Sequence, residues 1–264
     1  MLLRRIASGL NRQDWATVII ELVLVIAGVL IALQVDNWND SRENRVLERE
    51  YLGRLLDDLN GTIQDHNQTM EWNQTRLEQQ QLVLDSLRAG TLEKGREDEF
   101  ETGLAWVGRI NPLRRRWGAV EELNSTGNIS LILDLELRSG ISSLGAVYER
   151  SEKIVERETA STFFKRNQLT SRYQIRAVDV LGPARAEVVY DFDALVQDPE
   201  FINTFSDLQT TSHAIVSLSH VAMEAVERFR DDLAVRLSVA ASDLPRLQKR
   251  STGPWELESE DAYP

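Results

Sequence analysis

The first apolar stretch of the chain is long enough to cross a membrane. Residues 16–35 read ATVIIELVLVIAGVLIALQV and contain one ionisable side chain, that of Glu21. At about 1.5 Å of rise per residue, such a helix spans about 30 Å, the thickness of the hydrocarbon core of a bilayer. Trp15 and Trp38 flank the stretch, and indole rings favour the headgroup level. Because no small-x-small cleavage site follows, the pattern predicts an uncleaved transmembrane helix and not a signal peptide.

The charges on either side of this stretch predict its orientation. Arg4, Arg5 and Arg12 outnumber Asp14 before it, whereas no cationic excess follows it. The positive-inside rule therefore predicts that residues 1–15 are cytoplasmic. We expect a single-pass protein of the bacterial inner membrane whose bulk is periplasmic.

One face of the predicted membrane helix combines an acidic residue with small residues. Glu21, Gly28 and Ala32 share this face at about 100° per residue. Gly28 and Ala32 form a small-x-x-x-small pair that lets a second helix approach closely, with Glu21 hydrogen-bonded across the contact. Alternatively, the Glu21 carboxylate tilts toward the nearer headgroups. The expected partners are the lipid bilayer and either another membrane protein or a second copy of this chain.

The next stretch predicts a long amphipathic helix. Residues 40–89 contain no proline and place apolar residues at heptad spacing, which is typical of a coiled coil. A kink at Asn60-Gly61 and an end at Ala89-Gly90 fit the pattern. One heptad position becomes polar in its middle, which indicates either a water-filled or ligand-filled gap or a loosely packed, solvated seam. These polar positions are His66, Asn73 and Gln80.

The remaining chain also reads as helices. Helical patterns span residues 97–110, 117–123, 134–173 and a long stretch that begins at Pro199. Only residues 187–190 resemble a strand. Residues 242–264 are rich in proline and acidic side chains, which predicts a mobile acidic tail. We therefore expect an all-α fold in which residues 36–241 form an extracytoplasmic antiparallel helical bundle.

The end of the apolar stretch carries a sequence motif. Residues 28–39 read GVLIALQVDNWN. This resembles the G-[VI]-x-[IL]-[AG]-[LI]-Q-V-x-N-W-N element of an uncharacterised family of bacterial single-pass membrane proteins, which also have an acidic residue early in the membrane helix. Weaker elements of the same family are similar to residues 48–59 and 122–129. The resemblance implies a single-pass membrane topology. It implies no particular activity, because the family is uncharacterised. The motif residues are Gln34, Asn37, Trp38 and Asn39.

The apolar stretch also resembles the N-terminus of type IV pilins, which have a glutamate near the start of a hydrophobic helix. The glycine and phenylalanine at the pilin cleavage site are replaced here by Ala16 and Thr17. A pilin would also have a β-sheet head, which the remaining pattern does not predict.

The composition excludes several classes of function. The 264 residues include no cysteine and 3 histidines, so a disulfide, a cysteine nucleophile and a histidine-rich metal site are not expected. The net charge of −12 lies entirely beyond residue 36 and argues against nucleic-acid binding. Nucleotide-binding loops and the common hydrolase and metalloprotease motifs are missing. We therefore expect no enzyme, no cofactor and no metal.

One basic cluster stands out beyond the membrane helix. It consists of Arg114, Arg115, Arg116 and Trp117. In an acidic chain, such a cluster is a candidate site for an anion or an acidic partner, because guanidinium groups form paired hydrogen bonds with oxyanions. The alternative is local pairing with Glu121 and Glu122.

Together these features predict a non-enzymatic, membrane-anchored helical-bundle protein that acts as an accessory or scaffold subunit of an envelope assembly. The alternative is a periplasmic ligand-sensing or binding module. With only residues 1–15 in the cytoplasm, such a module would signal through a partner helix. A polar pocket near His66, Asn73 and the arginine cluster would favour this alternative.

Overall fold

The apolar stretch and the heptad pattern that follows it form one helix. In the computed structural model, which describes residues 15–111, 114–178 and 186–248, helix α2 runs from Trp15 to Ala89. It continues without a break through Asn60 and Gly61, so the expected kink is not found. The chain divides into two units, Met1–Tyr51 and Leu52–Pro264, and each is described by itself.

Helix α2 ends where the sequence predicts. Gly90 adopts a left-handed φ of 68°. Its N–H donates to the carbonyl of Leu87 at 3.3 Å, and the N–H of Thr91 donates to the carbonyl of Ser86 at 3.1 Å. This is a Schellman motif, which satisfies the last carbonyls of a helix and needs a residue that tolerates positive φ.

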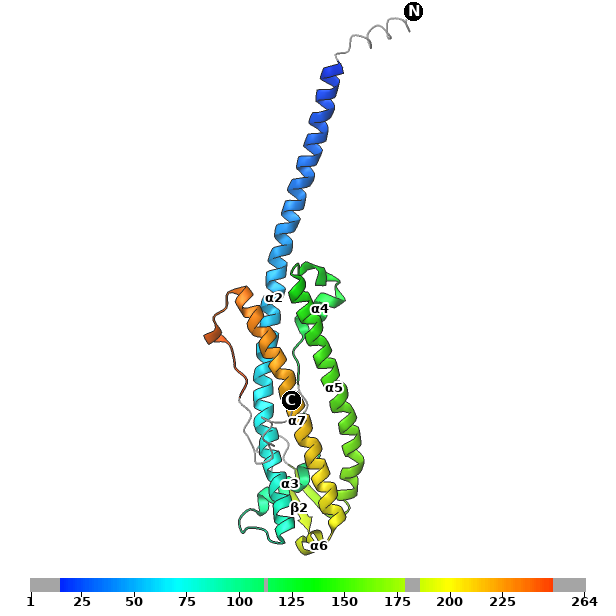
Figure 1. The fold of residues 1–264 in the computed structure, drawn as a ribbon, viewed down its shortest axis with the longest axis vertical. Coiled ribbons are helices and arrows are strands. Elements are labelled where there is room, and N and C mark those ends of the chain that lie inside the picture. Colours follow the sequence, from blue (N-terminus) through cyan, green and yellow to red (C-terminus); the bar gives the residue numbers. More distant parts are fainter. Residues whose placement is uncertain (1–14, 112–113, 179–185, 249–264) are drawn as a thin grey trace, which may run out of the picture. The chain divides into compact units, whose positions relative to one another are not determined.

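The second unit is mostly helical (Figure 1). Its other helices are α3 (Glu97–Trp106), α4 (Gly118–Ser125), α5 (Leu135–Leu169), α6 (Phe192–Val196) and α7 (Pro199–Leu237), with 3-10 turns η1 (Asn128–Leu131) and η2 (Ala241–Asp243). Aspartates cap the N-termini of α5 and α7. The Asp134 carboxylate accepts the N–H of Glu136 at 2.8 Å, and Asp198 accepts the N–H of Phe201 at 2.9 Å. These caps fix where α5 and α7 begin.

Helix α7 runs antiparallel to α2. Toward the end of α2, Gln209 donates to Gln81 at 2.8 Å, and further back along α2, Arg230 donates to Asn60 at 3.1 Å. The residue numbers rise along one helix as they fall along the other.

Helix α7 also runs antiparallel to α5, because Lys165 pairs with Asp207 while Gly140 meets Phe229. A Cβ on Gly140 would lie 2.5 Å from a ring carbon of Phe229, so this glycine allows the close approach. Helices α2 and α5 are therefore parallel to each other. The expected antiparallel arrangement holds for α7 against each neighbour but not for α2 against α5.

A connector between α3 and α4 makes this parallel arrangement possible. After Trp106 the chain returns along α2, and polar side chains of α2 bond its backbone. Gln80 donates to the carbonyl of Trp106 at 3.3 Å, Asn73 exchanges bonds of 3.4 and 3.2 Å with the carbonyl and N–H of Asn111, and Thr62 accepts the N–H of Arg116 at 2.9 Å. Buried backbone groups need such partners when they lie outside regular structure.

The connector begins at a tight turn. The helix predicted over residues 97–110 ends at Trp106 because Val107 leaves the helical region, with φ −56° and ψ 133°. Gly108 follows with φ 68°, and the N–H of Arg109 donates to the carbonyl of Trp106 at 3.0 Å. These angles define a type II β-turn, whose third residue needs a positive φ.

A two-stranded antiparallel sheet follows α5, and its second strand contains the strand-like run predicted at residues 187–190. Strand β1 (Tyr173–Val178) pairs antiparallel with β2 (Ala186–Tyr190), and Tyr173 lies opposite Tyr190. The prediction that α5 reaches residue 173 is wrong, since α5 ends at Leu169.

One apolar cluster lies where the two-stranded sheet, α3, the end of α2 and the start of α7 meet. Its fully buried members include Leu84, Phe100, Leu104, Phe201 and Phe205. Burying a side chain of this size contributes about 1.5–3 kcal/mol relative to leaving it in water.

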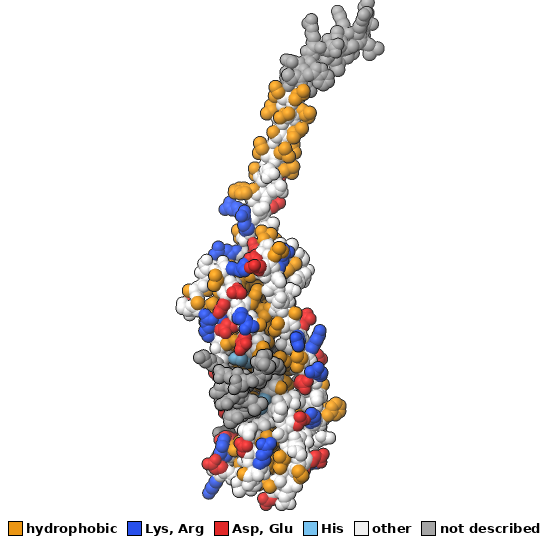
Figure 2. All heavy atoms as spheres, viewed as in Figure 1, with side chains coloured by type: hydrophobic (Ala, Val, Ile, Leu, Met, Phe, Trp, Pro, Cys, Tyr) orange, Lys and Arg blue, Asp and Glu red, His pale blue; other side chains and the backbone are white. Residues whose placement is uncertain are grey.

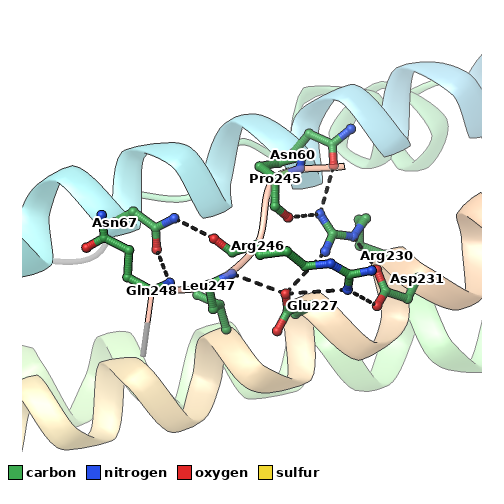
Figure 3. A network of polar contacts seen from close by, with 9 residues as sticks. All are labelled: Asn60, Asn67, Glu227, Arg230, Asp231, Pro245, Arg246, Leu247 and Gln248. Carbon is green, nitrogen blue, oxygen red and sulfur yellow. Dashed lines mark hydrogen bonds and ion pairs between the residues drawn. The ribbon is translucent and has the colours of Figure 1, made fainter. Parts of the chain in front are cut away.

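A fully buried arginine ties the chain after α7 to the long helices (Figure 3). Arg230 donates to Asp231 at 2.7 Å, to the carbonyl of Pro245 at 2.7 Å and to Asn60 at 3.1 Å. It also pairs with Glu227 at 3.4 Å. Its charge and most of its N–H groups are therefore satisfied without water.

The segment that follows η2 is bonded to the same group. Arg246 pairs with Asp231 at 2.6 Å, and Asn67 bonds the carbonyl of Arg246 at 2.8 Å and the N–H of Gln248 at 3.1 Å (Figure 3). Burial opposes ionisation of Asp231, but hydrogen bonds from both arginines outweigh it and lower the pKa of this carboxyl. The part of the predicted mobile tail up to Gln248 is thus fixed to α2 and α7, and residues 249–264 lie outside the described residues.

Candidate functional site

Among the described residues, nothing covers the apolar side chains in the first part of α2. From Ile19 to Val35 its large apolar side chains are 50–65% exposed. Figure 2 shows hydrophobic side chains covering this length of helix. It is the one described helix that is long and apolar enough to cross a membrane. Exposing this apolar surface to water costs a free energy of about 25 cal/mol per Å².

The predicted contact face lies on this exposed length. Glu21, Gly28 and Ala32 are all exposed in α2. A Cβ placed on Gly28 would find no neighbouring atom within 4 Å. By contrast, a Cβ on Gly103 would lie 2.5 Å from the carbonyl oxygen of Gln79, where α3 crosses α2. Gly28 therefore leaves room for a second backbone that the chain itself does not supply.

The motif residues Gln34, Asn37, Trp38 and Asn39 lie within α2 and not after its end. All four are exposed, and Trp38 is 62% exposed. Two of them form local hydrogen bonds: Asn39 donates to Glu43 at 3.1 Å, and the carbonyl of Asn37 accepts from Ser41 at 2.6 Å.

Trp38 lines a hollow on the side of α2. The other lining residues are Arg42, Arg45, Val46, Arg49 and Glu50. An indole beside arginines at helical spacing is typical of the headgroup region of a membrane.

The arginines of the predicted basic cluster are held by partners from distant parts of the chain. Arg115 pairs with Glu152 at 3.3 Å, and Arg116 forms two hydrogen bonds of 3.0 Å with Asp65. Gly61 makes room for Arg116, because a Cβ there would lie 2.6 Å from the guanidinium. These partners differ from Glu121 and Glu122, which the sequence suggested.

The side chains of this cluster lie in different surroundings. Trp117 is buried and its ring meets the edge of Tyr148 with centroids 5.3 Å apart. Arg115 lies 5.7 Å from the same Tyr148 ring, whereas Arg114 is exposed. The four residues thus do not converge on one cavity.

The three polar heptad positions of α2 form a buried stripe, and two of these side chains bond the connector. His66, Asn73 and Gln80 are 2%, 5% and 1% exposed. Asn73 and Gln80 bond the connector backbone, as described above. His66 lies 6.0 Å from His220 between ring centroids, and burial together with the charge of His220 lowers the pKa of His66 to about 4. The stripe therefore forms a packed polar seam around a neutral histidine.

A second basic group, which the sequence analysis missed, surrounds Trp106. The guanidinium carbon of Arg76 lies 3.9 Å from the centroid of the Trp106 ring, and that of Arg109 lies 5.6 Å from it. Arg109 and Arg166 line one cavity of about 570 Å³. These residues come from α2, the connector and α5, so no local spacing connects them. The one local signal is the sequence Trp106-Val107-Gly108-Arg109, in which the glycine turn returns the arginine to the tryptophan.

Among the described residues, no group of three or more His, Cys, Asp or Glu side chains is arranged to hold a metal ion. Comparison with known proteins gives no relative: no protein-family description, no curated protein and no solved structure matches this chain.

Proposed function

We propose that this protein is a non-enzymatic, single-pass protein of the bacterial inner membrane, whose periplasmic helical unit serves as an accessory or scaffold subunit of an envelope assembly. The observation that carries the proposal is the exposed apolar length of α2 from Ile19 to Val35. A soluble protein rarely exposes a continuous apolar surface of this size. A bilayer would cover it, since every backbone polar group of a helix is satisfied internally.

Two sequence features support the orientation. Arg4, Arg5 and Arg12 precede the helix, which favours a cytoplasmic N-terminus. The G-x-x-x-A-x-Q-V-x-N-W-N pattern resembles that of bacterial single-pass membrane proteins. The exposed Trp38 with Arg42 and Arg45 would then lie at the outer headgroups.

The face of Glu21, Gly28 and Ala32 supports a role in assembly. Gly28 has open space beside it, and an acidic side chain in hydrocarbon needs a hydrogen-bonding partner. A membrane helix of another protein would provide both a close contact and that partner. The proposed subunit role therefore depends on this face.

The orientation can be tested because the chain contains no cysteine. A membrane-impermeant maleimide added to intact spheroplasts should label Ser161→Cys, which is exposed on α5, but not Ser8→Cys. Labelling of Ser8→Cys alone would reverse the topology, and equal labelling of both before lysis would contradict a membrane-spanning helix.

The assembly role requires a second experiment on the full chain. Glu21→Leu combined with Gly28→Leu should remove most of the protein that copurifies in mild detergent, as identified by mass spectrometry. The control, Val23→Leu with Ile26→Leu on the opposite face, should retain it. A retained second copy of this chain would indicate a homo-oligomer. Absence of any copurifying chain from the parent would refute the subunit role.

One observation favours the alternative, a ligand-sensing or binding module. Arg109 lies beside the Trp106 ring with Arg76 and lines a cavity with Arg166, and these three arginines come from separate segments of the chain. Convergence of distant charged residues on a cavity is typical of binding sites.

A further inference from the structure

Three arginines converge on one side of the helical unit. Arg76 stacks on the Trp106 ring at 3.9 Å, and Arg109 lies 5.6 Å from the same ring. Arg109 shares a cavity with Arg166 of α5. The type II turn at Gly108 brings Arg109 back beside Trp106, so the arrangement is part of the fold and does not depend on a flexible side chain alone.

None of these arginines has an acidic partner. The ion pairs found within residues 15–111, 114–178 and 186–248 include neither Arg76, Arg109 nor Arg166. Acidic partners are not scarce, because the chain has 42 Asp and Glu against 30 Lys and Arg. Other described arginines also lack an ion pair, but at this place the missing pairing coincides with buried N–H groups and a cavity.

Several buried N–H groups at this place also lack acceptors among the described residues. They are Arg76 Nη1, Trp106 Nε1, Arg109 Nε and Arg166 Nε. Trp106 is 7% exposed, so water does not readily reach its side chain. A buried donor without an acceptor is unfavourable by about 1–3 kcal/mol, and a charged donor by more. An oxyanion in the cavity would supply acceptors to Arg109 and Arg166, which line it, and a compensating charge.

The electrostatics agree with this geometry. Burial lowers the pKa of Arg76 and of Arg166, and the nearby charge of Arg109 lowers each further. Arginine still stays protonated in proteins, so the positive charges remain. Burial raises the pKa of the adjacent Tyr173 to about 12, and its hydroxyl donates to the carbonyl of Leu104 at 2.9 Å. Tyr173 therefore does not neutralise the arginines.

We propose that Arg109 and Arg166, with Arg76 and Trp106 beside them, bind a small organic oxyanion: a carboxylate or phosphate group attached to an apolar body. The cavity of about 570 Å³ lies in the range of small-molecule sites. Ile110, Phe163 and Ile215 line it and would contact the apolar body. Glu156 also lines it and disfavours a second negative charge on the ligand. The site goes beyond the proposed scaffold role and deepens its alternative, a ligand-binding module.

The test uses the full chain in non-ionic detergent and follows thermal unfolding. Benzoate and phenyl phosphate are compared with chloride at equal ionic strength. We expect one of the two aromatic anions to raise the unfolding temperature saturably, and the one that does so identifies the carboxylate or the phosphate arm. Inorganic phosphate should act more weakly because it cannot use the apolar wall.

Variants locate the effect. Arg109→Gln and Arg166→Gln should each lose most of the anion-dependent shift. Arg150→Gln removes the same charge from an exposed position of α5 and should keep the shift. Without anion, Arg109→Gln should unfold at the same or a higher temperature than the parent, since it removes an unpaired charge. An arginine with a purely structural role would give a lower temperature.

The proposal is overturned if no anion stabilises the parent more than chloride does. It is also overturned if Arg150→Gln loses the shift to the same extent as Arg109→Gln. Either result leaves the membrane orientation untouched, because maleimide labelling measures that separately.

Discussion

Arg230 and the Arg76–Arg109–Arg166 group show two ways in which one helical unit handles buried positive charge. Arg230 is fully buried and is met by Glu227, Asp231 and two further oxygen acceptors. The other arginines are partly buried and have no ion-pair partner among the described residues; Arg76 and Arg109 lie at one indole ring, and Arg109 and Arg166 line one cavity.

The difference separates a structural arginine from a candidate ligand-binding one. A buried charge with a complete set of partners fixes one packing arrangement, and the network around Arg230 holds the segment after α7 in this way. Charges that are left without partners lower the stability of the folded chain, and such sites are typical of binding surfaces that are completed by a ligand. The same residue type thus has opposite expected effects on stability in the two places.

The largest loss of stability is expected from removing Arg230. Arg230→Ala removes the buried one of the two arginines that pair with Glu227 and Asp231, leaving only Arg246, and frees the carbonyl of Pro245. The free energy of unfolding should fall by about 3–5 kcal/mol, as for other buried pairs that lose one partner. Denaturant unfolding of the full chain in detergent measures this. The exposed neighbour Arg228→Ala should change it by less than about 0.5 kcal/mol. Similar losses in both variants would mean that burial of Arg230 contributes nothing specific.

His66 sharpens the comparison because it is a buried basic group that is kept neutral. Its pKa is lowered from 6.5 to about 4, so the unfolded chain binds a proton before the folded chain does. The stability from neutral His66 is complete above pH 6.5 and is lost as the pH falls toward 4. The loss amounts to about 3 kcal/mol at most.

Unfolding of the parent and of His66→Gln at several pH values in this window checks the effect. The variant should lose less stability on acidification than the parent, because it cannot take up this proton. Parallel curves for the parent and His66→Gln would show that His66 titrates normally.

A smaller effect should follow from altering the turn that positions Arg109. Gly108→Ala forces a side chain into a φ of 68° and places its Cβ 3.2 Å from Leu208. We expect a loss of about 1–2 kcal/mol, together with a smaller response to benzoate or phenyl phosphate. Gly145→Ala is the matched control: it lies in α5 with open space around it and should gain up to about 1 kcal/mol from helix propensity. Equal stability of the two variants would contradict a requirement for glycine at the turn.

The helices could be predicted from the sequence because their signals are local. The heptad pattern and Gly90 define the end of α2, and Pro199 after Asp198 marks the start of α7. The strand-like pattern of residues 187–190 is confirmed by β2, whereas β1 was missed because the helix before it was predicted to continue to residue 173 and the strand is short. The direction of α5 relative to α2 could not be predicted, because it depends on a connector whose contacts are with residues far away in the sequence.

The candidate site illustrates the same limit more strongly. The basic cluster from Arg114 to Arg116 is obvious in the sequence, yet Arg115 and Arg116 are paired with Glu152 and Asp65. Arg76, Arg109 and Arg166 are isolated in the sequence and come together only through the packing of three segments. Adjacent charges in a sequence therefore say little about which charges stay without partners after folding.

The hydrogen bonds between α2 and the connector join side chains of α2 to main-chain atoms of the connector. Asn73 and Gln80 contact main-chain atoms of Asn111 and Trp106, which are the same whatever side chains those positions carry. These contacts depend on the side-chain amides of α2 but not on the side chain of Asn111. A long helix with polar positions can in this way act as a template for the backbone of an irregular segment.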